Sequence, residues 1–359
     1  MISENNQKLK RTMPFKIAPI AMFIALALLV TPGSADSKTS GRPVRIVTLS
    51  FANGMSLNDV EKLVNREAAK GVDLIVLPET WTGRNPERLN GPTTKAMSAL
   101  AKKHETYIVS PIYRIVGDTT FNSAILIDRS GSVSCVYDKV CPHPPEYLSK
   151  YEGLTLKNAL TNLKCGSKAM VFETDFGKVG MAICFDIAFP ELWQEMADQG
   201  AELVVWPSAY PGGLSLQAHA INHHYYIVAA THNGRANQNC PVVDITGELI
   251  IDEGIPDKKT SDVTIARFTL DLDRAIFTKD YNYLGKAHQI VLDHPGDVEI
   301  EKFMPHEAWF VLRAKRPGVS VQKLAKQYGL RQLRDSLNFA RLEVDKRRGK
   351  KLNASLRNP

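Results

Sequence analysis

The sequence lacks the features that would set it apart from ordinary globular proteins. Its 359 residues contain no apolar run of the roughly 18 to 20 residues that a transmembrane helix needs. Hydrophobic residues make up 44% of the chain, which excludes a disordered chain, and its five cysteines are too few for a disulfide-knotted one. The sequence therefore predicts a folded protein with a substantial core.

The chain has few acidic residues relative to basic ones: 38 Asp and Glu against 45 Lys and Arg, which gives a net charge of +7. This net charge is unevenly distributed along the sequence. Residues 1–35 carry +3 and residues 313–359 carry +11, so the body between them carries −7. A uniformly basic surface would indicate an acidic partner. This distribution instead indicates a mildly acidic body with a basic tail.

The first 35 residues have the pattern of a secretory signal peptide. A basic stretch ends at Lys16, an apolar run of 14 residues follows from Ile17 to Val30, and residues 33–35 supply small side chains for cleavage. An uncleaved anchor is the alternative, although the run is short for one. We therefore expect an exported protein, periplasmic or secreted, with no stable membrane span after signal cleavage.

An odd number of cysteines cannot pair completely within one chain, so an exported form should keep a free thiol or bond to another chain. The chemistry described below favours Cys184 as the free one. The remaining four could form two disulfides in three connectivities or remain small buried residues; they are Cys135, Cys141, Cys165 and Cys240.

Strand and helix patterns alternate along the body. Short apolar or β-rich runs typical of buried strands are interleaved with stretches of helical spacing. The predicted strands are Val44–Ser50, Val72–Leu77, Tyr107–Ile115, Phe121–Asp128, Val133–Tyr137, Val179–Ile183, Leu203–Trp206, Tyr225–Thr231 and Val263–Leu270. The predicted helices are Leu57–Lys70, Ala96–His104 and one that begins at Pro190. This alternation predicts an α/β protein with helix-covered sheets, in one domain over residues 36–295.

Residues 296–359 form the basic tail. Apolar residues at helical spacing over Ser320–Arg347 predict one or two amphipathic helices, broken near Gly329. A helix-turn-helix that binds nucleic acid is the alternative for Val319–Arg334. For an exported protein we favour a helical extension that packs on the body or on a second subunit, and we expect no nucleic-acid partner.

An abrupt end to a strand at Cys184 is the first sign of chemistry. The apolar strand stops at this cysteine, and a helix is predicted to begin six residues later, at Pro190. Such a turn projects a side chain from the edge of a sheet beside exposed backbone N–H groups. The thiol could then attack a carbonyl carbon while one N–H receives the oxyanion. A buried structural cysteine is the alternative.

A thiol with a pKa of roughly 8.5 needs a base or a cation nearby to react at neutral pH. Four histidines cluster in the second half of the body: His219, His223, His224 and His232. His219 or His232 could be that base. His219 and His223 are one helical turn apart, a spacing that could also bind a metal, but the Glu of a His-Glu-x-x-His site is missing. His143, two residues after Cys141, is a weak indication of zinc. We expect no metal.

A carboxylate and a lysine fit the thiol better. Glu79 follows an apolar strand, at the carboxyl end where α/β sites are built, and burial against Trp81 should raise its pKa as a general base requires. Lys139 follows another strand and leads into a proline-rich loop that ends at Glu146. A lysine cation would stabilise an oxyanion and lower the pKa of the Cys184 thiol.

The combination of Glu79, Lys139 and Cys184 resembles the nitrilase superfamily of carbon–nitrogen hydrolases, over roughly Pro43 to His288. The motifs that carry the resemblance are Leu77-Pro78-Glu79, Tyr137-Asp138-Lys139, Gly180-Met181-Ala182-Ile183-Cys184-Phe185-Asp186, Phe189-Pro190-Glu191-Leu192 and Trp206-Pro207-Ser208-Ala209. Each motif is weak alone, and together they are specific.

The resemblance implies a four-layer αββα sandwich, pairing of subunits into homodimers or larger homo-oligomers, and no cofactor. It implies that Cys184 forms a thioester acyl-enzyme, that Glu79 is the general base, and that Lys139 stabilises the oxyanion with the backbone N–H of Phe185. Glu146 would orient the substrate and support the triad. Further candidates for substrate binding or support are Trp81 and Trp206.

The residues after the nucleophile bear on the substrate. Cys184-Phe185-Asp186 looks amidase-like, whereas enzymes that act on nitriles usually resemble Cys-Trp-Glu, so we expect hydrolysis of a linear amide or ureido bond in a small molecule. N-carbamoyl hydrolysis, nitrile hydrolysis and acyl transfer remain alternatives, as does a non-catalytic scaffold that keeps the fold. The loop of residues 139–146 and the basic tail depart from the family pattern. The motifs therefore do not define the shape of the pocket or the identity of the substrate.

Overall fold

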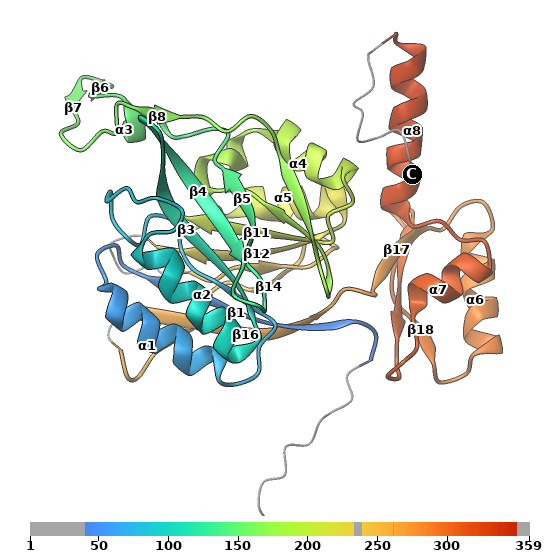
Figure 1. Ribbon diagram of the computed structural model, residues 1–359. Helices are drawn as coiled ribbons and strands as arrows, with labels where there is room; N and C mark the ends of the chain where they lie inside the picture. The colour runs from blue at the N-terminus through green and yellow to red at the C-terminus, as the bar shows by residue number, and fades with distance from the viewer. Residues whose placement is uncertain (1–39, 233–238, 261, 350–359) are drawn as a thin grey trace, which may run out of the picture. The chain divides into compact units, whose positions relative to one another are not determined.

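The computed structural model describes residues 40–232, 239–260 and 262–349 (Figure 1). The predicted signal peptide lies outside the described residues. Within those ranges, no helix is long and apolar enough to cross a membrane.

The first large sheet has a parallel centre, in which β1 pairs with β2 and β2 with β3, and antiparallel strands on both flanks. Its strands, in spatial order, are β15 (Ile255–Pro256), β16 (Val263–Asp271), β1 (Pro43–Phe51), β2 (Leu74–Val76), β3 (Tyr107–Val116), β4 (Thr119–Ile127) and β5 (Val133–Asp138), with β8 (Leu163–Lys164) beside β4.

The second large sheet repeats this plan. Its parallel centre is β10, β11 and β12, and antiparallel strands again flank it. Its strands, in spatial order, are β14 (Leu249–Ile251), β13 (Val242–Val243), β12 (Tyr226–Thr231), β11 (Leu203–Ser208), β10 (Gly177–Met181) and β9 (Met170–Thr174). A small ribbon of β6 (Lys150–Tyr151) and β7 (Leu154–Thr155) follows α3 (Pro144–Tyr147).

Three apolar cores separate four layers. The innermost core joins the two sheets face to face, with Val76 of β2 and Val205 of β11 among its members. A second core lies between the first sheet and two helices, α1 (Leu57–Ala68) and α2 (Pro92–His104) (Figure 1). A third lies between the second sheet and α4 (Pro190–Asp198) with α5 (Leu214–His223). The body is therefore an αββα sandwich, as the resemblance implied.

Local sequence explains where the elements begin. Ser56 caps α1 by accepting a hydrogen bond from the backbone N–H of Asp59, and Val60, Leu63 and Val64 form its buried stripe. Helix α2 starts at Pro92, four residues before the predicted Ala96, because proline suits the first helical turn. The predicted strands and helices of the body are confirmed, with shifts at their ends.

The C-terminal part has its own core. A third sheet has the order β17 (Ala275–Thr278), β19 (Trp309–Ala314) and β18 (Val298–Met304), and it packs against α6 (Tyr283–Asp293) and α7 (Val321–Gln327). We expected only helices in residues 296–359, so strands β18 and β19 are a correction. The predicted break near Gly329 separates α7 from α8 (Leu333–Arg347).

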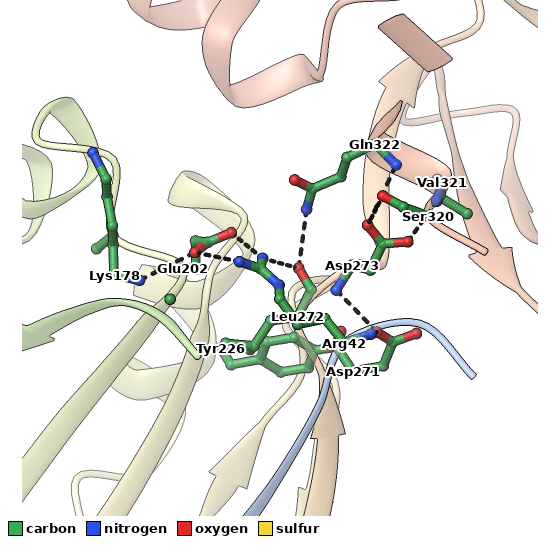
Figure 2. Close-up of polar contacts among 12 residues, drawn as sticks. Arg42, Lys178, Glu202, Tyr226, Asp271, Leu272, Asp273, Ser320, Val321 and Gln322 are labelled. Carbon is green, nitrogen blue, oxygen red and sulfur yellow. Dashed lines mark hydrogen bonds and ion pairs between the residues drawn. The ribbon is translucent and has the colours of Figure 1, made fainter. Parts of the chain in front are cut away.

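Polar contacts tie this part to the body (Figure 2). Arg42 pairs with Glu202 and donates to the backbone oxygen of Leu272 at 2.7 Å. The same oxygen accepts from the Gln322 amide at 3.0 Å. Asp273 accepts from the Ser320 hydroxyl at 2.7 Å and from the first backbone N–H of α7. The start of α7 is thus held by the two residues that follow β16 of the body.

Basic residues of α8 extend these contacts. Arg341 of α8 pairs with Asp198 of α4 at 2.8 Å, and Arg334 donates to the backbone oxygen of Ala201. Part of the positive charge of the tail is therefore used within the chain. All five cysteines are free thiols in the structure, so it forms neither of the two disulfides that we had left open.

Candidate active site

The turn at Cys184 holds its residue in an unusual backbone conformation. β10 ends at Met181, and a short 3₁₀ helix, η1 (Cys184–Ala188), leads into α4. Cys184 has a φ of 44°, in the left-handed region that residues other than glycine seldom adopt. The indole N–H of Trp206 donates to the backbone oxygen of Cys184 at 3.1 Å. Such strain persists only where surrounding contacts over-determine it, and it is common at active sites.

Asp186 is the carboxylate that fixes this turn. Its Oδ2 accepts from the backbone N–H of Ile183 at 2.9 Å and from the Tyr137 hydroxyl at 2.7 Å, and its Oδ1 accepts from the backbone N–H of Cys141 at 2.8 Å. Burial raises the pKa of Asp186 to about 6, although these hydrogen bonds oppose the shift. Asp186 therefore ties the cysteine turn to the segment that carries Lys139.

Three charged residues expected from the sequence, Glu79, Lys139 and Glu146, are joined by two ion pairs. The Lys139 ammonium lies 2.8 Å from Oε1 of Glu79 and 2.6 Å from Oε1 of Glu146, and its side chain is 1% exposed. Burial would lower the pKa of Lys139, but the charges of the carboxylates outweigh it and hold this pKa well above its ordinary value. The lysine is thus a fixed cation between two carboxylates.

Two uncharged residues that the sequence analysis missed complete the cluster. The Asn122 amide donates to Oε1 of Glu79 and to Oε2 of Glu146, both at 2.8 Å, and the Tyr113 hydroxyl donates to Glu146 at 3.3 Å. A polar Asn within an otherwise strand-like run was the available signal, since Asn is depleted in strands.

The pattern of donors leaves the two oxygens of Glu79 unequal. Lys139 and Asn122 both donate to Oε1. Among the described residues, no donor contacts Oε2. Glu79 is thus held in place through one oxygen while the other can accept a proton.

A cavity of about 610 Å³ brings the thiol and the carboxylates to one surface. It is lined by Asn53, Glu79, Thr80, Arg84, Tyr113, His143, Glu146, Cys184, Phe185, Ala209, Tyr210 and His232. Glu79 and Cys184 follow equivalent strands of the two sheets, each three residues after the strand ends, at Val76 and Met181. The repeated plan of the sheets therefore places a carboxylate and a thiol at the same cavity.

The thiol is protonated in this resting arrangement. Burial, with the negative charge of Glu79, raises the pKa of Cys184 to about 12, while Lys139 and hydrogen bonds from Ala209 and Ser208 oppose the shift. We expected Lys139 to lower this pKa; it does so, but the other two effects are larger. A nucleophile in this setting needs a base to take its proton as it attacks.

The structure separates the histidines that the sequence grouped together. His219 is buried, stacks on Trp193 with ring centroids 4.2 Å apart, and bonds the backbone oxygen of Ile187 at 2.9 Å, so it does not line the cavity. His232 does line it, and its Nε2 lies 2.8 Å from the hydroxyl of Thr80. Burial lowers the pKa of His232, which favours a neutral ring beside Glu79.

The two tryptophans also take different places. Trp206 supports the backbone of Cys184, as described above. Trp81 packs in the outer core against Phe51, with ring centroids 6.2 Å apart, and does not line the cavity. Thr80 has a φ of 51°, so the chain turns sharply after Glu79 and sends Trp81 to the other side of the first sheet. Phe185 and Glu146 do line the cavity.

Among the described residues, no group of three or more His, Cys, Asp or Glu side chains could hold a metal ion. Cys141 and His143 therefore belong to no metal cluster in those ranges.

The fold and this constellation define the class of the protein. The carbon–nitrogen hydrolase family matches residues 50–308, and the chain belongs to that family. It is a hydrolase of carbon–nitrogen bonds other than peptide bonds, in the amidase-like branch of the nitrilase superfamily.

The curated proteins that the chain is similar to include two amidases. The chain is 28% identical over 280 residues to an N-carbamoylputrescine amidase of Arabidopsis thaliana, covering 66% of this chain and 90% of the relative. It is 25% identical over 225 residues to a deaminated glutathione amidase of Synechocystis, covering 55% and 82%.

Solved structures share the fold. Nit3 of Saccharomyces cerevisiae, a member of branch 10 of the nitrilase superfamily, aligns with a TM-score of 0.52 and 20% identity over 64% of this chain and 90% of Nit3. A mutant amidase of Nesterenkonia sp. AN1, with an acetamide moiety on its active-site cysteine, aligns with a TM-score of 0.51 and 18% identity, over 64% and 91%.

Proposed function

We propose that this protein hydrolyses a linear amide of a small molecule through a thioester on Cys184. The observation that carries the proposal is the juxtaposition at one cavity of a thiol on a strained turn and a glutamate with one oxygen that no donor among the described residues contacts. The amidases among its relatives support an amide as the substrate class.

In the first half of the reaction, Sγ of Cys184 attacks the carbonyl carbon of the amide. Oε2 of Glu79 takes the thiol proton as the S–C bond forms. The oxygen that becomes negative is stabilised by the Lys139 ammonium and the backbone N–H of Phe185. When the C–N bond breaks, the proton passes from Glu79 to the nitrogen, and ammonia or an amine leaves.

In the second half, water attacks the thioester carbon. Glu79 accepts a proton from this water, the C–S bond breaks, and the sulfur recovers a proton as the carboxylic acid leaves. Lys139 remains protonated throughout, because two carboxylates hold its charge. Glu146 holds Lys139 in place through their ion pair at 2.6 Å and carries no proton in the cycle.

The test is turnover of a panel that contains a simple amide, an N-carbamoyl amine and a nitrile. We expect ammonia from the amide, loss of at least about 10⁴-fold of this activity in Cys184→Ala, and unchanged thermal unfolding of that variant. Wild-type protein should be labelled at Cys184 by a thiol alkylator, as read by mass spectrometry of peptides. Unchanged turnover in Cys184→Ala would end the proposal, and turnover of the N-carbamoyl amine alone would move it to a carbamoyl hydrolase.

We also propose export and self-association. The basic and apolar pattern of residues 1–35 supports export, and a mature chain that still begins at Met1 would contradict it.

Exposed apolar side chains on α8 support a homo-oligomer; they are Leu337, Phe339 and Val344. Light scattering that gives a monomer at micromolar concentration would contradict self-association.

A further inference from the structure

Two cysteines that the proposed reaction does not use lie on neighbouring segments beside Lys139. Cys141 comes two residues after Lys139, and Cys165 directly precedes Gly166. The backbone N–H of Gly166 donates to the backbone oxygen of Lys139 at 2.8 Å. A Cβ at Gly166 would collide with the backbone oxygen of Asp138, so the two segments pack main chain against main chain. These contacts bring Cys141 and Cys165 close to each other.

The two thiols differ in exposure and influence each other. Cys165 is exposed, whereas Cys141 is partly buried. Burial, with the charges of Asp186 and Glu191, raises the pKa of the Cys141 thiol to about 12, and the charge of Cys165 adds to this rise. A disulfide joins Cα atoms roughly 4.4 to 6.8 Å apart, the range found between chain segments that are hydrogen-bonded main chain to main chain. The arrangement of the two segments therefore suits a bond between Cys141 and Cys165.

The remaining cysteines lie apart from this pair. Sγ of Cys240 lies 3.6 Å from a backbone oxygen of β1 and 3.8 Å from one of β16. Cys135 lies on β5, four strands from β1 in the same sheet, or roughly 19 Å at the usual strand spacing. Cys135 and Cys184 belong to the innermost core or border it, whereas Cys141 packs on the third core, beyond the second sheet. Two disulfides therefore cannot form within the chain, and one bridge, between Cys141 and Cys165, remains.

A bridge at these positions would close the segment that supports the charged cluster. Residues 141–165 include α3 and the ribbon of β6 and β7. They also include Glu146, which pairs with Lys139 at 2.6 Å and accepts from the backbone N–H of His143 at 2.8 Å. A cross-link between the ends of a segment reduces the conformational freedom that the segment has in an open state. The bridge would thus restrain the segment that holds Glu146 without adding a group to the cavity, since neither cysteine lines it.

We propose that Cys141 and Cys165 form a disulfide when the protein meets a disulfide oxidant, and that this bond restrains residues 141–165 and leaves Cys184 as a free thiol. The exposed Cys165 thiolate attacks one sulfur of the oxidant, whose S–S bond breaks and releases one thiol. The Cys141 thiolate then attacks Sγ of Cys165 and releases the second thiol. Each cysteine loses one proton, and two electrons reduce the oxidant to two thiols. The proposed export would supply the oxidising surroundings in which such a bond persists.

The test starts from the full-length protein with all five thiols reduced and treats it with oxidised glutathione. After alkylation of the remaining thiols, peptide mapping by mass spectrometry identifies linked peptides, and a thiol-specific dye counts free thiols in denaturant. The variants are Cys165→Ser and Cys141→Ser. Cys135→Ser is the matched control, because Cys135 is also partly buried but borders a different core.

We expect one linked peptide that joins Cys141 to Cys165, and a thiol count that falls from five to three because two thiols pair. Cys135→Ser should form the same bridge, and the variants at Cys141 and Cys165 should form none. A second measurement uses Lys150 and Lys157, two exposed lysines between the cysteines. Chains that trypsin cuts at these lysines should stay joined on a denaturing gel when the wild type is oxidised and separate in Cys165→Ser.

Other outcomes overturn the inference. Glutathione on Cys165 without a linked peptide would show that the two thiols lie too far apart to bond. A linked peptide that contains Cys135, Cys184 or Cys240 would refute the pairing. A dimer on a gel without reductant that is joined through Cys165 would make this residue a contact between subunits instead. None of these measurements depends on amide turnover, so failure of the bridge leaves the proposed function standing.

Discussion

Glu67 and Glu79 are both glutamates with nearly complete burial, at 0% and 2% side-chain exposure, yet their surroundings are opposite. Glu67 of α1 accepts from Arg66 on Oε1, and from Lys70 and Arg267 on Oε2, at 3.0, 2.6 and 2.6 Å. Burial alone would raise the pKa of Glu67, but these three cations overcome it and lower the pKa to about 2. Both oxygens are occupied.

Around Glu79, carboxylates outnumber cations. It shares a single cation, Lys139, with a second carboxylate, Glu146, and keeps one oxygen unbonded within the described residues. Glu67 lies away from the cavity, whereas Glu79 lines it with Cys184. Burial of a carboxylate therefore does not by itself indicate a catalytic base. The two glutamates differ in the number of cations per carboxylate, and only Glu79 has, within the described residues, an oxygen without a donor at the cavity that Cys184 also lines, which supports the role proposed for Glu79.

Replacing each glutamate by glutamine gives the largest expected difference. Glu79→Gln keeps the shape but removes the proton acceptor, so kcat/KM for an amide should fall by about 10³-fold. Glu67→Gln should leave kcat/KM within about twofold of wild type, because this residue touches neither the cavity nor Cys184. Ammonia release measures both, with the folded fraction of each variant as the control. Comparable losses in the two variants would refute the comparison.

The free energy of unfolding should depend more on Glu67 than on Glu79, which is the reverse of the expected effect on activity. Glu67→Gln should lower the free energy of unfolding at pH 7 by about 2 kcal/mol, since the three cations lose their charged acceptor but remain partly solvated. The pKa of Glu67 is lowered from 4.5 to about 2, so its contribution is present above pH 4.5 and is lost as the pH falls toward 2. Urea unfolding at several pH values measures it, and the gap between wild type and variant should shrink with acid. A gap that stays constant with pH would contradict this role for the charge.

Much of the candidate site could be predicted from the sequence because its residues follow strands. Glu79, Lys139 and Cys184 each come within three residues of the end of a strand, where the sites of α/β proteins are usually built. Local pattern was sufficient for these positions, and for the elements of the body.

The supporting residues could not be found in this way. Asn122 reaches Glu79 and Glu146 only because β4 pairs with β3 and β5 in a particular register, which is a property of the assembled sheet. Trp81 was expected beside Glu79, but the positive φ of Thr80 reverses its side, and composition gives no sign of that turn. In residues 298–304, the alternation of Val298 and Ile300 with Glu299 and Glu301 was a usable strand signal.

The smallest expected effect tests the redundancy of the cations around Glu67. Lys70→Gln should cost less than about 1 kcal/mol of unfolding free energy and leave activity unchanged, because Arg66 and Arg267 still hold the carboxylate and the Lys70 side chain is 44% exposed. The matched change at the site, Lys139→Gln, should abolish turnover, since no second cation among the described residues contacts Glu79. A loss of stability in Lys70→Gln as large as in Glu67→Gln would mean that the three cations act as one unit, and charge ratio alone would then no longer distinguish the two glutamates.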